Sequence, residues 1–191
     1  MRLFLMGWVA PTLFLFACAG DSGAPAASNT PPTAPVAAAP VAAPAVPATP
    51  ATAFACCADD ASGKVVGAYL DAQAALAKDD NAAAGAALTS LQAQVDAAKA
   101  TPGIDEAGTL ALAAIATETS AALAATDIEP RRTAVKKLSA AVLPYARAHA
   151  GGSRTITEAF CPMADASWLQ EGGTIANPYY GASMLTCGSF K

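Results

Sequence analysis

Apolar residues recur along much of this chain at the spacing of one face of a helix. Between residues 84 and 98 they step by four, three, four and three positions, and between residues 135 and 149 by three, four, three and four. This period predicts four helices, at about Asp60–Ala77, Asp80–Pro102, Asp105–Ala125 and Asp127–Gly151. Short connections between helices of this length favour antiparallel neighbours. The pattern therefore predicts an all-α fold, an up-down four-helix bundle over about residues 60–150.

The helical period ends after Gly152. Thr155–Cys161 reads either as a short helix or as an extended lead-in, and a last helical turn is expected around Ala182–Thr186. Glycine and proline punctuate the residues between them, which is typical of turns. We therefore predict a loop-rich cap over about residues 153–191, folded back on the end of the bundle where His149 emerges.

The first 53 residues differ in composition from the rest of the chain. Arg2 precedes an apolar run, Leu3–Phe16, that is shorter than the roughly 20 residues of a membrane-spanning helix. The end of this run resembles a bacterial lipoprotein signal, which predicts a signal peptide over residues 1–17 and a lipid on Cys18. An ordinary secretory signal is the alternative. Residues 18–53 are rich in proline and alanine, which predicts a disordered tether before a domain at residues 54–191.

Both readings of the signal place the mature chain outside the cytoplasm. Ala19, rather than aspartate, follows Cys18, and by resemblance to other lipoproteins this favours sorting to the outer membrane. We expect a protein of the cell envelope that faces the periplasm, with exposure at the cell surface left open. The lipid would be its only contact with the membrane.

Charge and composition exclude several classes of function. The formal net charge is -4 and no basic patch is present in the sequence, so nucleic acid is not an expected partner. The chain has one histidine and shows no Ser–His–acid order, glycine-rich phosphate loop or zinc-binding histidine pair. Few groups are available for general acid–base chemistry, and we predict that the protein is not an enzyme.

Sulfur is concentrated near the C-terminus. Cys161 and Met163 stand two residues apart, and Met184 and Cys187 stand three apart. Thiolate and thioether donors select soft ions such as Cu(I) over hard cations, so these four residues are the first candidate ligands. His149 is the next candidate because imidazole is a common metal ligand. It also continues the apolar stripe of the fourth helix, so it could instead cap the core.

A disulfide between Cys161 and Cys187 is the main alternative to a metal site. The expected compartment is oxidising, and an intervening loop of this length is ordinary for a disulfide. Such a bond would stabilise the fold by roughly 3 kcal/mol and remove both thiols as ligands. Exchange between the bridged and metal-binding states is a third reading.

Cys56 and Cys57 stand where the tether meets the domain. As free thiols they could capture or pass on a soft ion, so they are candidate accessory thiols. They could also pair with Cys161 or Cys187, while a bond between the two neighbours would be strained. The sequence leaves these alternatives open.

The C-terminal residues also carry a specific pattern of motifs. These motifs are Phe160-Cys161-Pro162-Met163-Ala164, Trp168, Ile175, Asn177-Pro178-Tyr179-Tyr180-Gly181 and Met184-Leu185-Thr186-Cys187-Gly188. The pattern resembles a bacterial periplasmic domain of unknown function that is found alone or attached to copper/silver efflux adaptor (membrane fusion) proteins. The chain lacks the barrel-sandwich, hairpin and β-barrel regions of those adaptors, so it should not itself bridge a pump to a channel.

The resemblance implies a role in heavy-metal handling. The resulting expectation is an envelope lipoprotein that binds Cu(I) or Ag(I) for copper sequestration, delivery or resistance, with a heavy-metal efflux complex as a candidate partner. The alternative is a non-catalytic structural or interaction module, closed by the Cys161–Cys187 disulfide, that docks onto an efflux or envelope complex.

Overall fold

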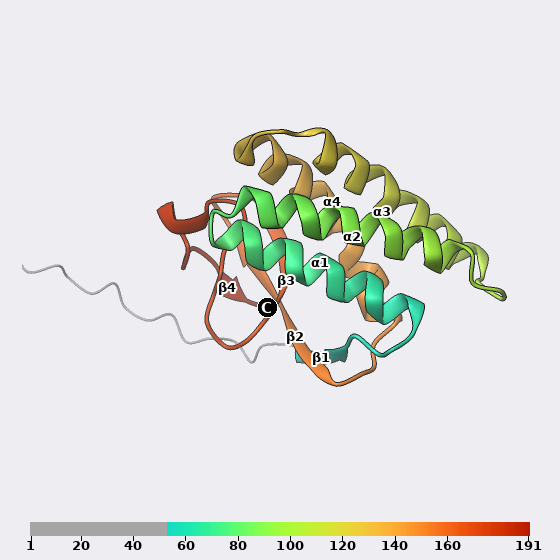
Figure 1. The fold of residues 1–191 in the computed structure, drawn as a ribbon. Helices are drawn as coiled ribbons and strands as arrows, with labels where there is room; N and C mark the ends of the chain where they lie inside the picture. Colours follow the sequence, from blue (N-terminus) through green and yellow to red (C-terminus); the bar gives the residue numbers. More distant parts are fainter. Residues whose placement is uncertain (1–52) are drawn as a thin grey trace, which may run out of the picture. The chain divides into compact units, whose positions relative to one another are not determined.

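The computed structural model of this chain describes residues 53–191. The predicted signal peptide, the predicted lipidation site Cys18 and all but the last residue of the predicted tether lie outside the described residues. Four helices and four strands follow one another from Ala53 onward (Figure 1). In chain order they are β1 (Ala53–Cys56), α1 (Ala61–Ala77), α2 (Asn81–Lys99), α3 (Glu106–Ala124), α4 (Ile128–Ala148), β2 (Arg154–Cys161), β3 (Ala166–Glu171), the 3-10 turn η1 (Gly181–Ser183) and β4 (Ser189–Phe190).

The four helices lie where the apolar period predicts them. Aspartates cap three of them: Asp60 accepts a hydrogen bond from the Gly63 N–H at 2.7 Å, and Asp80 and Asp105 act in the same way at the starts of α2 and α3. One stripe of apolar side chains on each helix is buried in a shared core. Its fully buried members include Val65, Leu76, Leu88, Leu91, Val95, Leu112, Ile115, Leu138 and Val142.

The predicted fold class is wrong, because the residues expected to form a loop-rich cap contain three of the four strands of an antiparallel sheet. β2 is its central strand: β3 pairs along one edge, and β1 and β4 pair end to end along the other. The protein is therefore a mixed α/β fold rather than an all-α bundle. The Thr155-Ile156-Thr157 run that begins β2 is β-branched and favours a strand, which decides the alternative left open for Thr155–Cys161.

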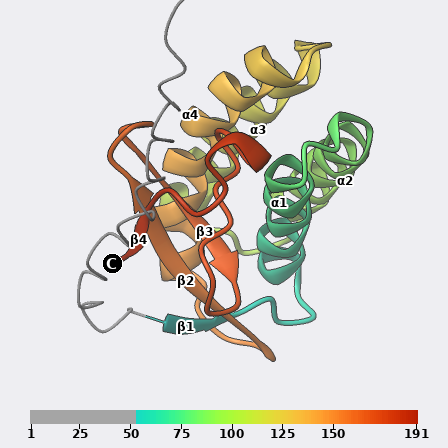
Figure 2. The same ribbon diagram turned by 90° about the vertical axis from the view of Figure 1, so that its left-hand side faces the viewer.

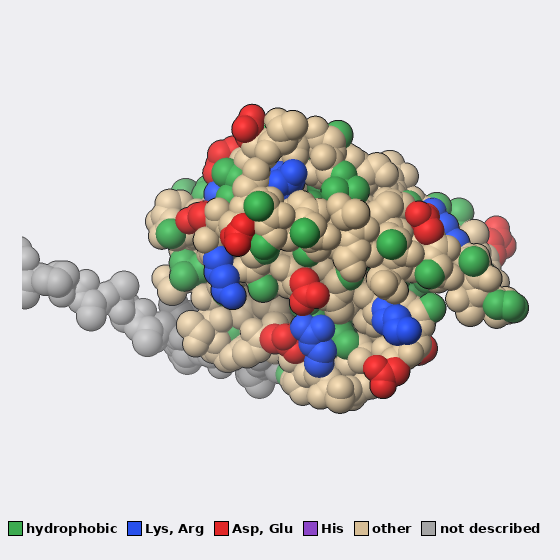
Figure 3. Space-filling model, in the orientation of Figure 1, with side chains coloured by type: hydrophobic (Ala, Val, Ile, Leu, Met, Phe, Trp, Pro, Cys, Tyr) green, Lys and Arg blue, Asp and Glu red, His purple; other side chains and the backbone are tan. Residues whose placement is uncertain are grey.

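The sheet packs against the helices through β3. Both α1 and α4 contact this strand, while α2 packs on α1 and α3 packs on α4 (Figures 1 and 2). Figure 3 shows acidic and basic side chains interspersed over one face of the molecule, without a large patch of either sign on that face. The arrangement leaves the last twenty residues, 172–191, to cross the surface between the sheet and the helices. We call these residues the terminal segment.

The terminal segment lies at the opposite end of the helices from the predicted position. It was expected beside His149, which ends α4, but its contacts are with Asp79, just after α1, and with Arg132, in the first turns of α4. The cause is the direction of β2, which runs back along α4. Glu158 in β2 pairs with Arg147 of α4, and further along the hairpin the Ala164 carbonyl accepts from Lys136.

Candidate functional site

The two cysteines of the C-terminal motifs face each other across the sheet edge. Cys161 is the last residue of β2, and Cys187 lies two residues before β4, which pairs with β2. Their Sγ atoms are 2.9 Å apart. This separation is longer than a disulfide bond of about 2.05 Å, yet short enough for one thiol to donate a hydrogen bond to the other. We call these two side chains the thiol pair.

Gly188 and Asn177 hold Cys187 beside Cys161. Gly188 has a φ of +140°, and a Cβ there would lie 2.8 Å from the Phe160 carbonyl oxygen and 2.9 Å from the Trp168 ring. Only glycine fits this close approach without strain. The Asn177 side-chain amide is buried and donates to the Cys187 carbonyl at 2.8 Å. These residues of the C-terminal motifs are therefore positioning residues for the thiol pair.

The two thiols differ in their electrostatics. Burial alone would raise the pKa of Cys161. The hydrogen bonds that its sulfur accepts from the Cys187 thiol, from the Ala164 and Met163 backbone N–H groups and from the Asn177 side chain outweigh burial and lower that pKa below its ordinary value. The pKa of Cys187 is raised, first because its thiol donates to Cys161 and then because it is desolvated. The first proton to leave the pair comes from Cys161, and the resulting thiolate is the form that binds metals and attacks disulfides.

The two methionines belong to the segments that carry the thiols. Met163 follows Cys161 in the β2–β3 turn, and its side chain is 66% exposed. Tyr180 of the terminal segment donates to the Met163 carbonyl at 3.0 Å and so ties that turn down. Met184 is partly exposed, and its carbonyl accepts from the Cys187 N–H at 3.0 Å. Both thioethers are therefore carried by turns next to the thiol pair.

His149 does not join the thiol pair. It is the exposed C-cap of α4, where its Nδ1 lies 2.9 Å from the Tyr145 carbonyl and its ring lies 4.3 Å from the Tyr145 ring. It lines a cavity of about 370 Å³ together with Asp60 and Thr101, and none of the four candidate sulfur ligands borders that cavity. The structure thus separates His149 from the sulfur residues, because β2 carries the chain away from the end of α4.

Cys56 and Cys57 are also remote from the thiol pair. Their sulfur atoms are joined to each other as a disulfide. Cys56 ends β1 and pairs with Arg154, at the other end of β2 from Cys161. The structure therefore offers neither residue as a free accessory thiol, and it joins neither to Cys161 or Cys187.

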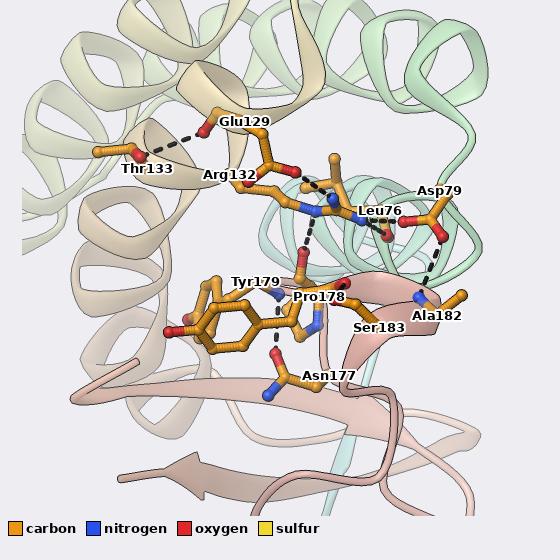
Figure 4. A network of polar contacts seen from close by, with 11 residues as sticks. Leu76, Asp79, Glu129, Arg132, Thr133, Asn177, Pro178, Tyr179, Ala182 and Ser183 are labelled. Carbon is orange, nitrogen blue, oxygen red and sulfur yellow. Dashed lines mark hydrogen bonds and ion pairs between the residues drawn. The ribbon is translucent and has the colours of Figure 1, made fainter. Parts of the chain in front are cut away.

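Sequence reasoning missed the clamp that fastens the terminal segment to the helices (Figure 4). The buried Arg132 guanidinium donates to the Pro178 carbonyl at 3.1 Å and to the Leu76 carbonyl at 2.9 Å, and it forms an ion pair with Asp79. Asp79 in turn accepts from the Ala182 N–H at 3.0 Å. In the sequence, Arg132 belongs to a polar first turn of a helix and reads as a surface residue. Nothing in the spacing links it to Asp79 or to the Asn177-Pro178 turn.

The clamp should make part of the stability of the protein depend on acid pH. The Arg132 guanidinium, and then the Ala182 N–H, lower the pKa of the Asp79 carboxyl below its ordinary value. A lowered pKa in the folded state contributes stability above the ordinary value of about 3.9, and this stability is lost as the pH falls through the folded value. We expect the fall in unfolding free energy between about pH 5 and pH 2 to be smaller in Asp79→Asn than in the wild type, as measured by urea titration.

Asp96→Asn is the control for this measurement, because Asp96 is exposed on α2 and its carboxylate accepts hydrogen bonds from the Gln92 side chain of the same helix. It should leave the acid dependence unchanged. Parallel curves for the wild type and Asp79→Asn would contradict the role assigned to the clamp.

Within residues 53–191, no three histidine, cysteine, aspartate or glutamate side chains gather into a group that could hold a metal ion. Any metal site at the thiol pair therefore consists of two thiolates, completed by thioether or other ligands. No protein-family model matches the chain, and neither a curated protein nor a solved structure matches it significantly.

Proposed function

We propose that this protein binds one soft monovalent ion, Cu(I) or Ag(I), through Cys161 and Cys187, and that it sequesters or delivers this ion as a lipid-anchored protein of the cell envelope. One observation carries the proposal. Two thiols from segments 26 residues apart in the chain face each other at 2.9 Å, at an edge of the sheet where one of them reaches solvent. Soft ions prefer thiolates and accept low coordination numbers.

The thiol pair requires only a small movement to accept an ion. Metal–thiolate bonds of about 2.3 Å allow two sulfur ligands to stand up to about 4.6 Å apart, so the thiols must separate by roughly 1–2 Å. Cys187 is the side chain able to move, because it lies in the irregular stretch between η1 and β4 and is only partly buried. Cys161 stays fixed in the sheet.

Two thiolates around a monovalent cation leave one excess negative charge. The groups that lower the pKa of Cys161, namely the Ala164 and Met163 backbone N–H groups and the Asn177 side chain, would offset part of that charge. The exposed Met163 thioether is the first candidate for a third ligand and Met184 is the second. His149 is left out of the proposed ligand set, because it lies with Tyr145 at the end of α4.

Replacing Cys187 with serine should abolish tight Cu(I) binding. Loss of an outer-shell partner costs a metal site roughly 10- to 100-fold in affinity, and loss of a thiolate ligand should exceed that. The measurement is competition for Cu(I) with a chromophoric Cu(I) chelator, using the reduced full chain under anaerobic conditions in the background in which Cys56 and Cys57 are replaced by serine. Cys161→Ser should give the same result, and Met163→Leu a smaller loss.

The Cys56→Ser, Cys57→Ser double variant is the matched control, since it also removes two thiols but at the other end of β2. It should keep the wild-type affinity, as should His149→Ala. If Cys187→Ser bound Cu(I) as tightly as the wild type, or if the double variant lost binding, the proposed ligand set would be refuted.

A structural disulfide is the second candidate for the thiol pair, and the short sulfur–sulfur separation favours it. In that case the protein is a non-catalytic module that docks onto an efflux or envelope complex through other surfaces. Its oxidised form should be more stable than the reduced form by roughly 3 kcal/mol. The reduced form should then bind Cu(I) no better than Cys187→Ser, which separates the two functions in one experiment.

A further inference from the structure

The thiol pair is open to solvent from one side only. Cys161 is 0% exposed, whereas Cys187 is partly exposed. The Ala164 N–H and the Asn177 side chain favour charge on the Cys161 sulfur, while the Met163 N–H acts on both sulfurs. Access and charge stabilisation are therefore divided between the two sulfurs.

We propose that the thiol pair undergoes thiol–disulfide exchange with an external dithiol, and that the attacking thiolate enters at Cys187 and expels Cys161. The inference rests on the proposed function only in using the same two thiols, and it adds the reaction that interconverts their bridged and metal-binding forms. The external dithiol is a reductant that carries two neighbouring thiols, either a small molecule or a protein.

The exchange proceeds in two balanced steps. A thiolate of the external dithiol attacks the Cys187 Sγ of the oxidised pair. A sulfur–sulfur bond forms there, the Cys161–Cys187 bond breaks, and its electron pair remains on Cys161 as a thiolate. The second thiol of the reductant, after losing its proton, then attacks its own partner sulfur and releases Cys187. Cys187 and Cys161 end as thiol and thiolate, and the reductant ends as a cyclic disulfide.

The direction of attack follows from the geometry. A thiolate displaces a disulfide sulfur along the line of the breaking bond, from the side opposite the leaving sulfur. Cys187 is partly exposed, so an external thiolate has access to this residue from the solvent. Cys161 has no exposed surface, so the same approach to its sulfur is blocked.

The backbone around the pair favours the same leaving group. The Ala164 and Met163 backbone N–H groups and the Asn177 side chain favour negative charge on the Cys161 sulfur, whereas of these three only the Met163 N–H also favours it on Cys187. Asn177 is fixed beside the pair because it donates to the Cys187 backbone carbonyl at 2.8 Å. Reduction would thereby open the metal site, and oxidation would close it.

Mapping the mixed disulfide tests this proposal. The full chain, with Cys18, Cys56 and Cys57 replaced by serine, is oxidised, treated with glutathione, quenched with acid and alkylated, and its peptides are analysed by mass spectrometry. Glutathione is a monothiol, so the first intermediate persists. We expect glutathione on Cys187 and the alkyl group on Cys161, with at least about a tenfold preference. Glutathione on Cys161, or equal labelling, would overturn the proposal, as would no exchange with either glutathione or dithiothreitol.

Single-thiol variants in the same background provide a second readout. The thiol that remains in Cys161→Ser should react with an aromatic disulfide at least about ten times faster than the thiol that remains in Cys187→Ser. Circular dichroism verifies that both variants are folded. Equal rates in folded variants would overturn the proposal. The Cu(I) affinity of the reduced protein is measured separately. Tight Cu(I) binding together with exchange at Cys161 would refute this inference and leave the proposed function standing. Exchange at Cys187 without Cu(I) binding would refute the proposed function and leave this inference standing.

Discussion

Replacing Trp168 with alanine is expected to lower the free energy of unfolding by about 4 kcal/mol and to disorganise the thiol pair. Trp168 is the largest fully buried side chain of the described residues. Its ring meets the Tyr179 ring edge-on at a centroid distance of 5.7 Å, and its Nε1–H donates to the Gln170 side chain at 2.9 Å. Removal leaves a cavity between β3 and the terminal segment and removes the surface against which Gly188 packs.

Trp168→Phe is the matched control, because it keeps an aromatic ring and loses only the Nε1–H and part of the volume. It should cost clearly less than the alanine variant. Urea denaturation gives the stability, and the alkylation rate of Cys187 under native conditions reports on the thiol pair. A loss below about 1 kcal/mol in Trp168→Ala, which is the size of a typical surface or minor core change, would contradict the packing described for β3.

Replacing Arg132 with methionine is expected to cost about 3 kcal/mol and to release the terminal segment. Methionine approximates the length of the arginine stem but carries no donor. The buried carbonyls of Leu76 and Pro178 then lose their partner, and Asp79 loses its ion pair. Unsatisfied buried acceptors cost more than the hydrogen bonds themselves contribute. Alkylation of Cys187 should become faster, because the chain on the N-terminal side of it is no longer held.

Arg131→Met is the matched control for this variant. Arg131 is equally buried and donates to the carbonyls of Ala122, Ala125 and Asn81, so it joins the ends of neighbouring helices without touching the terminal segment. It should lower the unfolding free energy by a similar amount and leave the alkylation rate of Cys187 unchanged under strongly native conditions. Equal acceleration in both variants would mean that global stability, rather than the clamp, controls access to Cys187.

The helices were predictable because each satisfies its own local rules. In α2, Leu88, Leu91 and Val95 are all fully buried and lie on one face, and Asp80 supplies the cap that the sequence suggests. Both signals lie within a few residues of the helix that they define. A reader of the sequence needs no tertiary information to find them.

The sheet was not predictable in this way, because its central strands are buried without alternation. Four consecutive residues of β2, Ile156–Ala159, are buried, and one of them is the charged Glu158. Arg147 and Lys191, from α4 and from the end of the chain, satisfy this carboxylate. β3 likewise buries Gln170, whose partners include Trp168 of the same strand and Thr174 and Ala176 of the terminal segment. Strands that bury satisfied polar residues in this way show no period of two.

Only part of the candidate site was predictable, because some of its residues are brought together by contacts that leave no local signal in the sequence. The concentration of sulfur indicated Cys161 and Cys187, and the structure brings these two thiols together. The sequence also suggests His149 for this site, because it ends a helix just before the sulfur-rich residues. In the structure β2 instead carries the chain away from that helix end. The Arg132–Asp79 clamp joins residues from two helical regions, and no local signal reveals such a pair.

The pairing of β1 with β2 has a consequence for the order in which the chain becomes ordered. β1 opens the described chain, but the strand that completes its hydrogen bonds follows all four helices. A chain emerging from the ribosome or from a translocation channel can form its helices from local contacts, while β1 waits for nearly the whole domain. Until then its edge can pair with a strand of another molecule. A chaperone that shields residues 53–56 until β2 has formed would therefore protect this protein at its most vulnerable stage.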